Sequence, residues 1–236
     1  MSSPRCRFRS ACSRSGKGGF TLVELLVVIA IIALLAAVAI GPITGAMKTA
    51  KDNAGMQTTH AIYVADFQYN IDNNNFADGA DSGVIAQALM NGGYISDPSI
   101  FLIKGGGTTP FVGANAAQNI QATNVSWDFL GSSPAGSGST TTYSGLTTSD
   151  PEQLPLVWST GNTIVIPTAA GVFGTATVNG NGKNGFGTDG IAVAYLSGAS
   201  AFKKVSNITT LNIAQFIDNS YTPPANPTYQ VRFGSH

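Results

Sequence analysis

A single acidic side chain, Glu24, lies near the start of an otherwise uninterrupted apolar run from Phe20 to Ile40. At about 1.5 Å rise per residue, a helix over this run would be roughly 31 Å long, close to the thickness of a bilayer core. The run is therefore long enough to cross a membrane once. A charge inside such a helix costs roughly 2.5 to 3.5 kcal/mol or more and is rare without a partner. The position of Glu24 consequently indicates a function for this carboxylate.

The segment ahead of the apolar run is strongly basic. Residues 1–19 contain no acid and five cations, which are Arg5, Arg7, Arg9, Arg14 and Lys17. Positive charge next to a membrane helix favours the cytoplasmic side. The sequence therefore predicts a cytoplasmic N-terminus, with everything after Ile40 on the other side of the membrane.

The order of the small residues distinguishes this segment from an ordinary secretory signal. Such a signal has a short apolar core followed by a small-residue cleavage site. Here the apolar stretch is too long, and Gly18 and Gly19 come before it. Cleavage at these glycines would leave the whole apolar helix on the mature protein.

Gly19, followed by FTLVE at residues 20–24 and an apolar helix, resembles the prepilin signature of type IV pilins and type II secretion pseudopilins. The resemblance implies that a prepilin peptidase/methyltransferase cuts between Gly19 and Phe20 and methylates the new amine of Phe20. It also implies a helical filament as the assembled form. The implied partners are further copies of this chain, other pilins or pseudopilins, an inner-membrane assembly platform and membrane lipid. The implied location is the inner membrane, with a single pass and a periplasmic head, and later a periplasmic or extracellular filament.

Within this resemblance, Glu24 has a physical reason to set the assembly register. An α-amino group has an unperturbed pKa of about 7.7 to 8.0, so the new amine of Phe20 is a cation near neutral pH. Opposite charges attract far more strongly in a dry site than in water. We therefore expect Glu24 of one subunit to pair with the amine of its neighbour. The alternative is a plain membrane anchor with a snorkelling glutamate.

The resemblance, together with composition and patterning, predicts four segments. These are a cleaved leader at 1–19, a transmembrane and assembly helix at 20–41, its amphipathic continuation at 42–75, and a β-rich head at 76–236 with a Gly/Ser-rich loop near 131–145. The 236 residues include only 10% charged side chains and 28 glycines, which suits one modest domain with an anchor. Gly41 and Pro42 predict a kink or local opening of the helix, because proline lacks a backbone donor.

Both cysteines, Cys6 and Cys12, lie in the leader. The processed chain would therefore have no disulfide. Many type IV pilins close a C-terminal loop with such a bond, so its absence favours a pseudopilin. Loss of the leader also removes five of the twelve cations and none of the twelve acids, which leaves seven against twelve. This balance lacks a basic nucleic-acid footprint, and no nucleic-acid partner is expected.

The fold predicted for the head is α+β, with the long helix covering an antiparallel sheet. Apolar residues at helical spacing continue the helix from Ile43 to Tyr69, on a face with Met47, Ala50, Ala54, Ala61, Ala65 and Tyr69. Asparagines at 70–75 should end it. A short helix should follow between the cap at Asp81-Ser82 and the stop at Gly92-Gly93.

Short runs bounded by turn residues predict strands at 100–103, 125–130, 156–159, 163–166, 171–178, 191–196 and 199–205. Two turns predict hairpins. One is Thr160-Gly161-Asn162 and the other is Ser197-Gly198. Residues 207–217 fit either a helix or a strand.

Catalysis finds little support in the processed chain. Its imidazoles are His60 and His236, and it has no cysteine nucleophile, so we expect no enzyme activity. GNGKNG at 180–185 has the letters of a dinucleotide fingerprint, but no helix pattern follows, so we interpret it as a loop. The same stretch faintly resembles the calcium loop of major pseudopilins, with Asn181, Asn184 and Asp189 as ligands. No other cofactor is predicted.

An alternative function is a monomeric, membrane-tethered extracytoplasmic binding domain with a pilin-like anchor. Its ligand contacts would come from loop aromatics such as Trp127, Trp158 and Tyr221. Both tryptophans lie in strand-like runs, which favours core packing for them instead.

Overall fold

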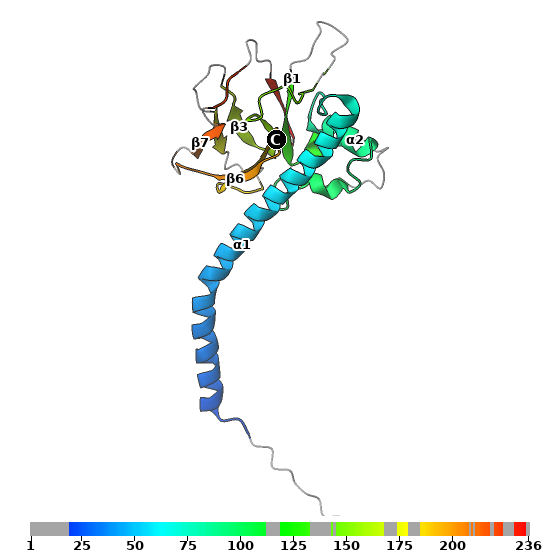
Figure 1. The fold of residues 1–236 in the computed structure, drawn as a ribbon. Coiled ribbons are helices and arrows are strands. Elements are labelled where there is room, and N and C mark those ends of the chain that lie inside the picture. Colours follow the sequence, from blue (N-terminus) through cyan, green and yellow to red (C-terminus); the bar gives the residue numbers. More distant parts are fainter. Residues whose placement is uncertain are drawn as a thin grey trace, which may run out of the picture. The chain divides into compact units, whose positions relative to one another are not determined.

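The long helix α1 (Leu22–Asn73) joins two units of the chain, Met1–Met47 and Lys48–His236. This computed structural model describes residues 19–111, 119–132, 143, 145–167, 174–178, 185–207, 209, 211–217, 220–223 and 229–234. The first unit contributes the apolar part of α1, and the second is the head, which includes the rest of the helix (Figure 1).

In the first unit the apolar part of α1 is exposed. Its large apolar side chains from Phe20 to Ile43 have exposed fractions between 45% and 79%. Among the residues that the structure describes, α1 is the one helix that is long and apolar enough to cross a membrane, judged by length and composition. This agrees with the predicted anchor.

The helix continues through Gly41 and Pro42, so the local opening predicted there is absent. Pro42 still lacks an N–H, which leaves the carbonyl group of Val38 without its usual donor. The hydroxyl of Thr44 donates to the carbonyl oxygen of Gly41 at 2.8 Å. A kink at this weakened turn stays a prediction.

Of the apolar face predicted for the continuation of α1, only Ala65 is buried. The predicted Met47, Ala50, Ala54 and Ala61 are exposed. The buried residues are Asp52, Gly55, Thr59, Ile62, Ala65, Asp66 and Asn70. The alanine pattern misled the prediction because alanine accepts either environment. What fixes the face is close contact at Gly55, where an added Cβ would collide with the ring of Phe186.

The ends of the helices follow the prediction. α1 ends at Asn73, and Asn74 then takes a left-handed conformation with φ 60°. α2 (Ser82–Asn91) begins with Asp81 as its N-cap, whose carboxylate accepts from the backbone N–H of Val84 at 3.0 Å. Gly93, with φ 77°, turns the chain after α2.

The strands form two antiparallel sheets. The larger has the order β6-β5-β2-β1-β8 and contains β1 (Trp127–Ser132), β2 (Pro155–Ser159), β5 (Gly190–Tyr195), β6 (Ser200–Lys204) and β8 (Tyr229–Arg232). The smaller has the order β3-β4-β7 and contains β3 (Asn162–Val165), β4 (Gly174–Val178) and β7 (Asn212–Ile217). Two short 3₁₀ helices, η1 (Pro98–Phe101) and η2 (Ala122–Asn124), precede β1.

Two hydrophobic cores lie on opposite faces of the larger sheet. Trp127 and Phe129 of β1 belong to the core shared with α1 and α2, whereas Leu130 belongs to the core shared with the smaller sheet. β2 and β5 are buried along their whole length, which is why their sequences are continuously apolar. The predicted α+β class, with a long helix on antiparallel strands, is confirmed, and the second sheet adds a layer that was not predicted (Figure 1).

The predicted hairpin around Gly161 is wrong. β2 pairs with β1 and β5, whereas β3 pairs with β4 in the other sheet. Thr160 explains the difference, because its N–H donates to the carbonyl oxygen of Ser126 at 2.9 Å and its hydroxyl to Asp128 at 2.7 Å. These bonds keep Thr160 beside β1, and the chain then crosses to the smaller sheet.

Other predictions are settled in the described residues. The hairpin of β5 and β6 around Gly198, which has φ 83°, is confirmed. The strand predicted at 100–103 is wrong, because the 3₁₀ helix η1 lies there. The carboxylate of its N-cap, Asp97, accepts from the N–H of Ser99 at 2.9 Å. Residues 212–217 are strand β7. Much of the predicted 131–145 loop lies outside the described residues.

Buried polar contacts fasten the C-terminal strand β8. Arg232 forms an ion pair with Asp78 at 2.7 Å, and the two side chains are 5% and 1% exposed. The N–H of Gly234 donates to Asp128 at 2.7 Å, and the hydroxyl of Ser82 donates to the carbonyl oxygen of Phe233 at 2.8 Å. These contacts join the chain's last described residues to β1 and to the segment between the two helices, without a disulfide.

Asp66 is a fully buried carboxyl group in the head part of α1. Its Oδ1 accepts from the backbone N–H of Ala77 at 2.8 Å, while Oδ2 has no hydrogen-bond partner among the described residues. Burial raises the pKa of Asp66, the hydrogen bond from Ala77 opposes the rise, and the charge of Asp78 adds to it, so that the pKa is about 7. Ionised Asp66 therefore weakens the folded head.

The pKa of Asp66 is higher in the folded head than in the unfolded chain. Protonated Asp66 therefore contributes fully to the unfolding free energy below about pH 4, and this contribution is lost as the pH rises to about 7. Asp66→Asn removes the pH-dependent contribution while keeping an acceptor for the N–H of Ala77. We expect the unfolding free energy of the variant, relative to wild type, to rise by a few kcal/mol across this range. Fluorescence of the buried Trp127 and Trp158 during urea unfolding in detergent measures it.

Glu152→Gln is the control for loss of an acid, because Glu152 is exposed in the head. The rise in relative unfolding free energy across this pH range should be specific to Asp66→Asn. If the unfolding free energy of Asp66→Asn relative to wild type were independent of pH, burial would not have raised the pKa of this carboxyl group.

Candidate processing and assembly site

Gly19 and Phe20 lie in irregular chain immediately before α1. Both are exposed, and the side chain of Phe20 is 79% accessible. Helical backbone begins only at Leu22. The peptide bond between Gly19 and Phe20 is therefore outside regular structure, which is the arrangement that a peptidase needs at its cleavage site.

Thr21 and Glu24 cap the start of the helix. The hydroxyl and the N–H of Thr21 both donate to Oε2 of Glu24, at 2.7 and 2.8 Å. In return, the N–H of Glu24 donates to the hydroxyl oxygen of Thr21 at 3.2 Å. This reciprocal pattern is a capping box, in which two unpaired donors of the first helical turn gain partners. The T-x-x-E spacing needed to predict it is present in the sequence, but sequence reasoning singled out Glu24 alone.

The box leaves part of Glu24 available. Both hydrogen bonds from Thr21 go to Oε2, and Oε1 has no hydrogen-bond partner in the part of the chain that the structure describes. The first turn of a helix also favours a negative charge. A single carboxylate can thus cap its own helix with one oxygen and present the other to a cation.

The predicted calcium site is only partly covered by the structure. Asn181 and Asn184 lie outside the described residues. Asp189 forms an ion pair with Lys48 at 2.7 Å. Within the described ranges, no three His, Cys, Asp or Glu side chains gather as metal ligands. Calcium binding by this loop stays a prediction.

The aromatic residues proposed for a ligand-binding role are in the core. Trp127, Trp158 and Tyr221 each have an exposed fraction of 0%. They are therefore unavailable for contacts with a ligand, and the core packing favoured by the sequence is confirmed. His60 is exposed, with Nδ1 at 3.4 Å from the hydroxyl oxygen of Ser200, and His236 is outside the described residues.

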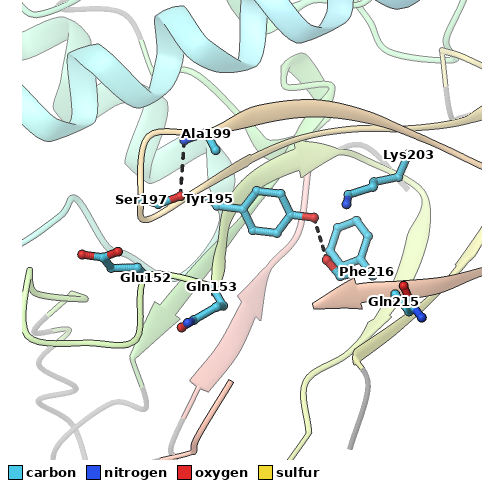
Figure 2. A pocket seen from close by; sticks show the side chains of 8 residues that line it. All are labelled: Glu152, Gln153, Tyr195, Ser197, Ala199, Lys203, Gln215 and Phe216. Carbon is cyan, nitrogen blue, oxygen red and sulfur yellow. Dashed lines mark hydrogen bonds between the residues drawn. The ribbon is translucent and has the colours of Figure 1, made fainter. Parts of the chain in front are cut away.

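A cavity of about 240 Å³ opens at the edge of the core between the sheets, beside Tyr195 and Phe216. Figure 2 shows the Tyr195 hydroxyl directed at the carbonyl group of Phe216, to which it donates at 2.6 Å. The ammonium group of Lys203 lies 5.7 Å from the centre of the Tyr195 ring. The rest of the lining is Glu152, Gln153, Ser197, Ala199 and Gln215. None of the predicted site residues lies in this cavity.

The exposed apolar helix, with a capped start and an accessible Gly-Phe bond ahead of it, agrees with the predicted membrane anchor. The family model described as the prokaryotic N-terminal methylation motif matches residues 14–40. The type IV wide pilus major component PilA4 of Thermus thermophilus is 50% identical to this chain over 60 residues. No solved structure matches the chain.

The shared 60 residues are 25% of this chain and 44% of that relative, so the chain spans less than half of the relative's length in the alignment. Together the motif and the relative support a likeness to the type IV pilin-like family over part of this chain. The resemblance drawn from FTLVE in the sequence is thereby confirmed at the level of the family.

The capping box gives a test at the start of the helix. Thr21→Val removes the hydroxyl group that both donates to and accepts from Glu24, and losing an N-cap costs about 1 kcal/mol. We expect amide hydrogen exchange of residues 22–25 to become several-fold faster in detergent micelles. Thr44→Val is the control, because the Thr44 hydroxyl bonds only to Gly41 within the same helix. Unchanged exchange in Thr21→Val would show that the box does not stabilise the first turn.

Proposed function

We propose that this chain is a structural subunit of a type IV pilus-like filament. In this proposal the prepilin peptidase/methyltransferase cuts between Gly19 and Phe20 and methylates Phe20. The processed subunit waits in the inner membrane, with its head in the periplasm, and then enters the filament through an assembly platform. The observation that carries the proposal is the capped Glu24 with one unused oxygen, at the start of an exposed apolar helix.

The exposed half of α1 supports a filament. Its apolar side chains are stable only in lipid or against other apolar surfaces, because water disfavours them. Before assembly the bilayer supplies this environment. Afterwards the same half of neighbouring subunits supplies it, so one segment serves as both anchor and packing surface.

The charges at the start of α1 support a defined register. Cleavage creates an α-amino group on Phe20, which is a cation near neutral pH. Oε1 of Glu24 is oriented by the capping box and is available to the amine of a neighbouring subunit. In the apolar interior of a filament the attraction is little screened, so a subunit inserted one step out of register would leave a buried charge unpaired.

Within the class, we propose a pilus over a secretion pseudopilus. The relative is named as the major component of a type IV wide pilus. The missing disulfide favoured a pseudopilin, but the buried pair of Asp78 and Arg232 closes the C-terminal region by other means. Immunogold labelling of intact cells distinguishes the two, because a pilus carries the head outside the cell and a pseudopilus keeps it in the periplasm.

Glu24→Gln separates the assembly charge from the helix cap. Glutamine fits the same capping box, so the start of α1 should stay ordered, while the negative charge is lost. We expect filament yield in cells that express only this variant to fall by about tenfold or more, the ratio given by about 1.4 kcal/mol of lost pairing. Sheared filaments measured by immunoblot against the membrane pool give the readout.

Glu152→Gln is the matched control, because Glu152 is an exposed acid in the head. It should assemble as the wild type does. Normal filaments from Glu24→Gln, with slow amide exchange at residues 22–25, would refute pairing through this charge.

A further inference from the structure

A second cavity, of about 340 Å³, lies in the head beside the start of its part of α1. Its lining is mostly apolar and comes from α1, the segment at 102–104, β1 and the loop before β5. Trp127, Phe186 and Gly55 form its buried wall, and Ala54 and Leu102 lie nearer the surface. Gly55 lets the ring of Phe186 pack closely against α1 in this wall, because an added Cβ would collide with that ring.

Two exposed cations, Lys51 and Lys104, line this apolar cavity. Neither has an acidic partner within 4 Å in the described part of the chain, where the ion pairs are those of Lys48 with Asp189 and Arg232 with Asp78. The ammonium group of Lys51 lies 5.8 Å from the centre of the Phe186 ring. Cations beside an apolar wall suit a ligand that has an anionic group joined to an apolar body.

The sequence places one of these cations, Lys51, next to the membrane anchor. α1 carries no charged residue from Leu25 to Met47, and this stretch of helix is about 35 Å long at 1.5 Å per residue. A bilayer core is about 30 Å thick, and about 40 to 45 Å with its headgroups. Lys48 and Lys51 are the first charges after the stretch, so they reach the level of the headgroups when it crosses the bilayer.

We propose that the cavity lined by Lys51 and Lys104 binds an anionic phospholipid. The two ammonium groups bind the lipid phosphate, and the apolar lining at Ala54, Leu102 and Phe186 receives glycerol and hydrocarbon. The bound lipid holds the head of an unassembled subunit against the membrane surface. This proposal rests on membrane anchoring by α1 and not on filament assembly.

The test uses the full chain in nanodiscs of phosphatidylcholine alone or of an equimolar mixture with phosphatidylglycerol. After gentle extraction, native mass spectrometry counts the lipids that each chain retains. Juxtamembrane cations contribute about 1 kcal/mol each toward anionic lipid, so we expect phosphatidylglycerol to be enriched about tenfold or more over phosphatidylcholine. We also expect slower amide exchange at residues 51–58 in the mixed discs.

Three variants locate the site. Lys51→Gln with Lys104→Gln should lose the enrichment, whereas Lys51→Arg with Lys104→Arg should retain it. Ala54→Phe keeps both cations but fills the cavity, and should also lose it. Lys203→Gln removes a cation from the other cavity and is the matched control, with wild-type retention expected. Fluorescence of the buried tryptophans verifies that each variant is folded.

Several outcomes would overturn the proposal. Equal retention of both lipids by the wild type would do so, as would full enrichment in the double Gln variant. Inorganic phosphate that slows exchange at residues 51–58 as much as the anionic lipid does would make the ligand a free ion. Slower exchange in pure phosphatidylcholine that grows with the number of chains per disc would make the occupant a second copy of the chain. Failure of the wild type to enter nanodiscs would instead contradict the anchor itself.

Discussion

The structure depends on one constraint, which is that α1 carries no charge from Leu25 to Met47 while its large apolar side chains stay exposed. Water cannot stabilise such a surface. It needs lipid or other apolar helices, and the proposed cleavage ahead of the helix would leave this surface on the mature chain. The capped Glu24 is the charge at the start of this apolar stretch that we propose to pair between subunits.

In the head, buried polar groups join segments that are distant in the sequence. Asp78 and Arg232 fasten β8, and Asp128 accepts from both Thr160 and Gly234. Removing one partner of a buried ion pair leaves an uncompensated charge, which commonly costs 3 to 5 kcal/mol. Such contacts close the C-terminal region of a chain whose two cysteines both lie in residues 1–19. Asp66 has the opposite effect, because its ionised form destabilises the same head.

The sequence predicted those features that depend on local patterns. The apolar helix, the cap at Asp81, the turn at Gly198 and the α+β class each follow from residues close together in the chain. The errors came from long-range contacts. Asp128 keeps Thr160 beside β1, so the chain crosses to another sheet, and Phe186 selects the buried face of α1 through Gly55. At the candidate site, Glu24 was predicted to be functional because a charged side chain is unfavourable in lipid. The capping role of Thr21 was missed, because it follows only if the T-x-x-E spacing is interpreted as a capping box.

The most direct test of the central claim is the intact mass of the protein purified from its native membrane, compared with protein made without the prepilin peptidase. The proposed processing predicts loss of residues 1–19 together with a gain of about 14 Da from one methyl group, with both changes dependent on the peptidase. An uncut, unmethylated mass in the native membrane would contradict it. Glu24 would then lack the cation it is proposed to pair with, and α1 would be only an N-terminal anchor.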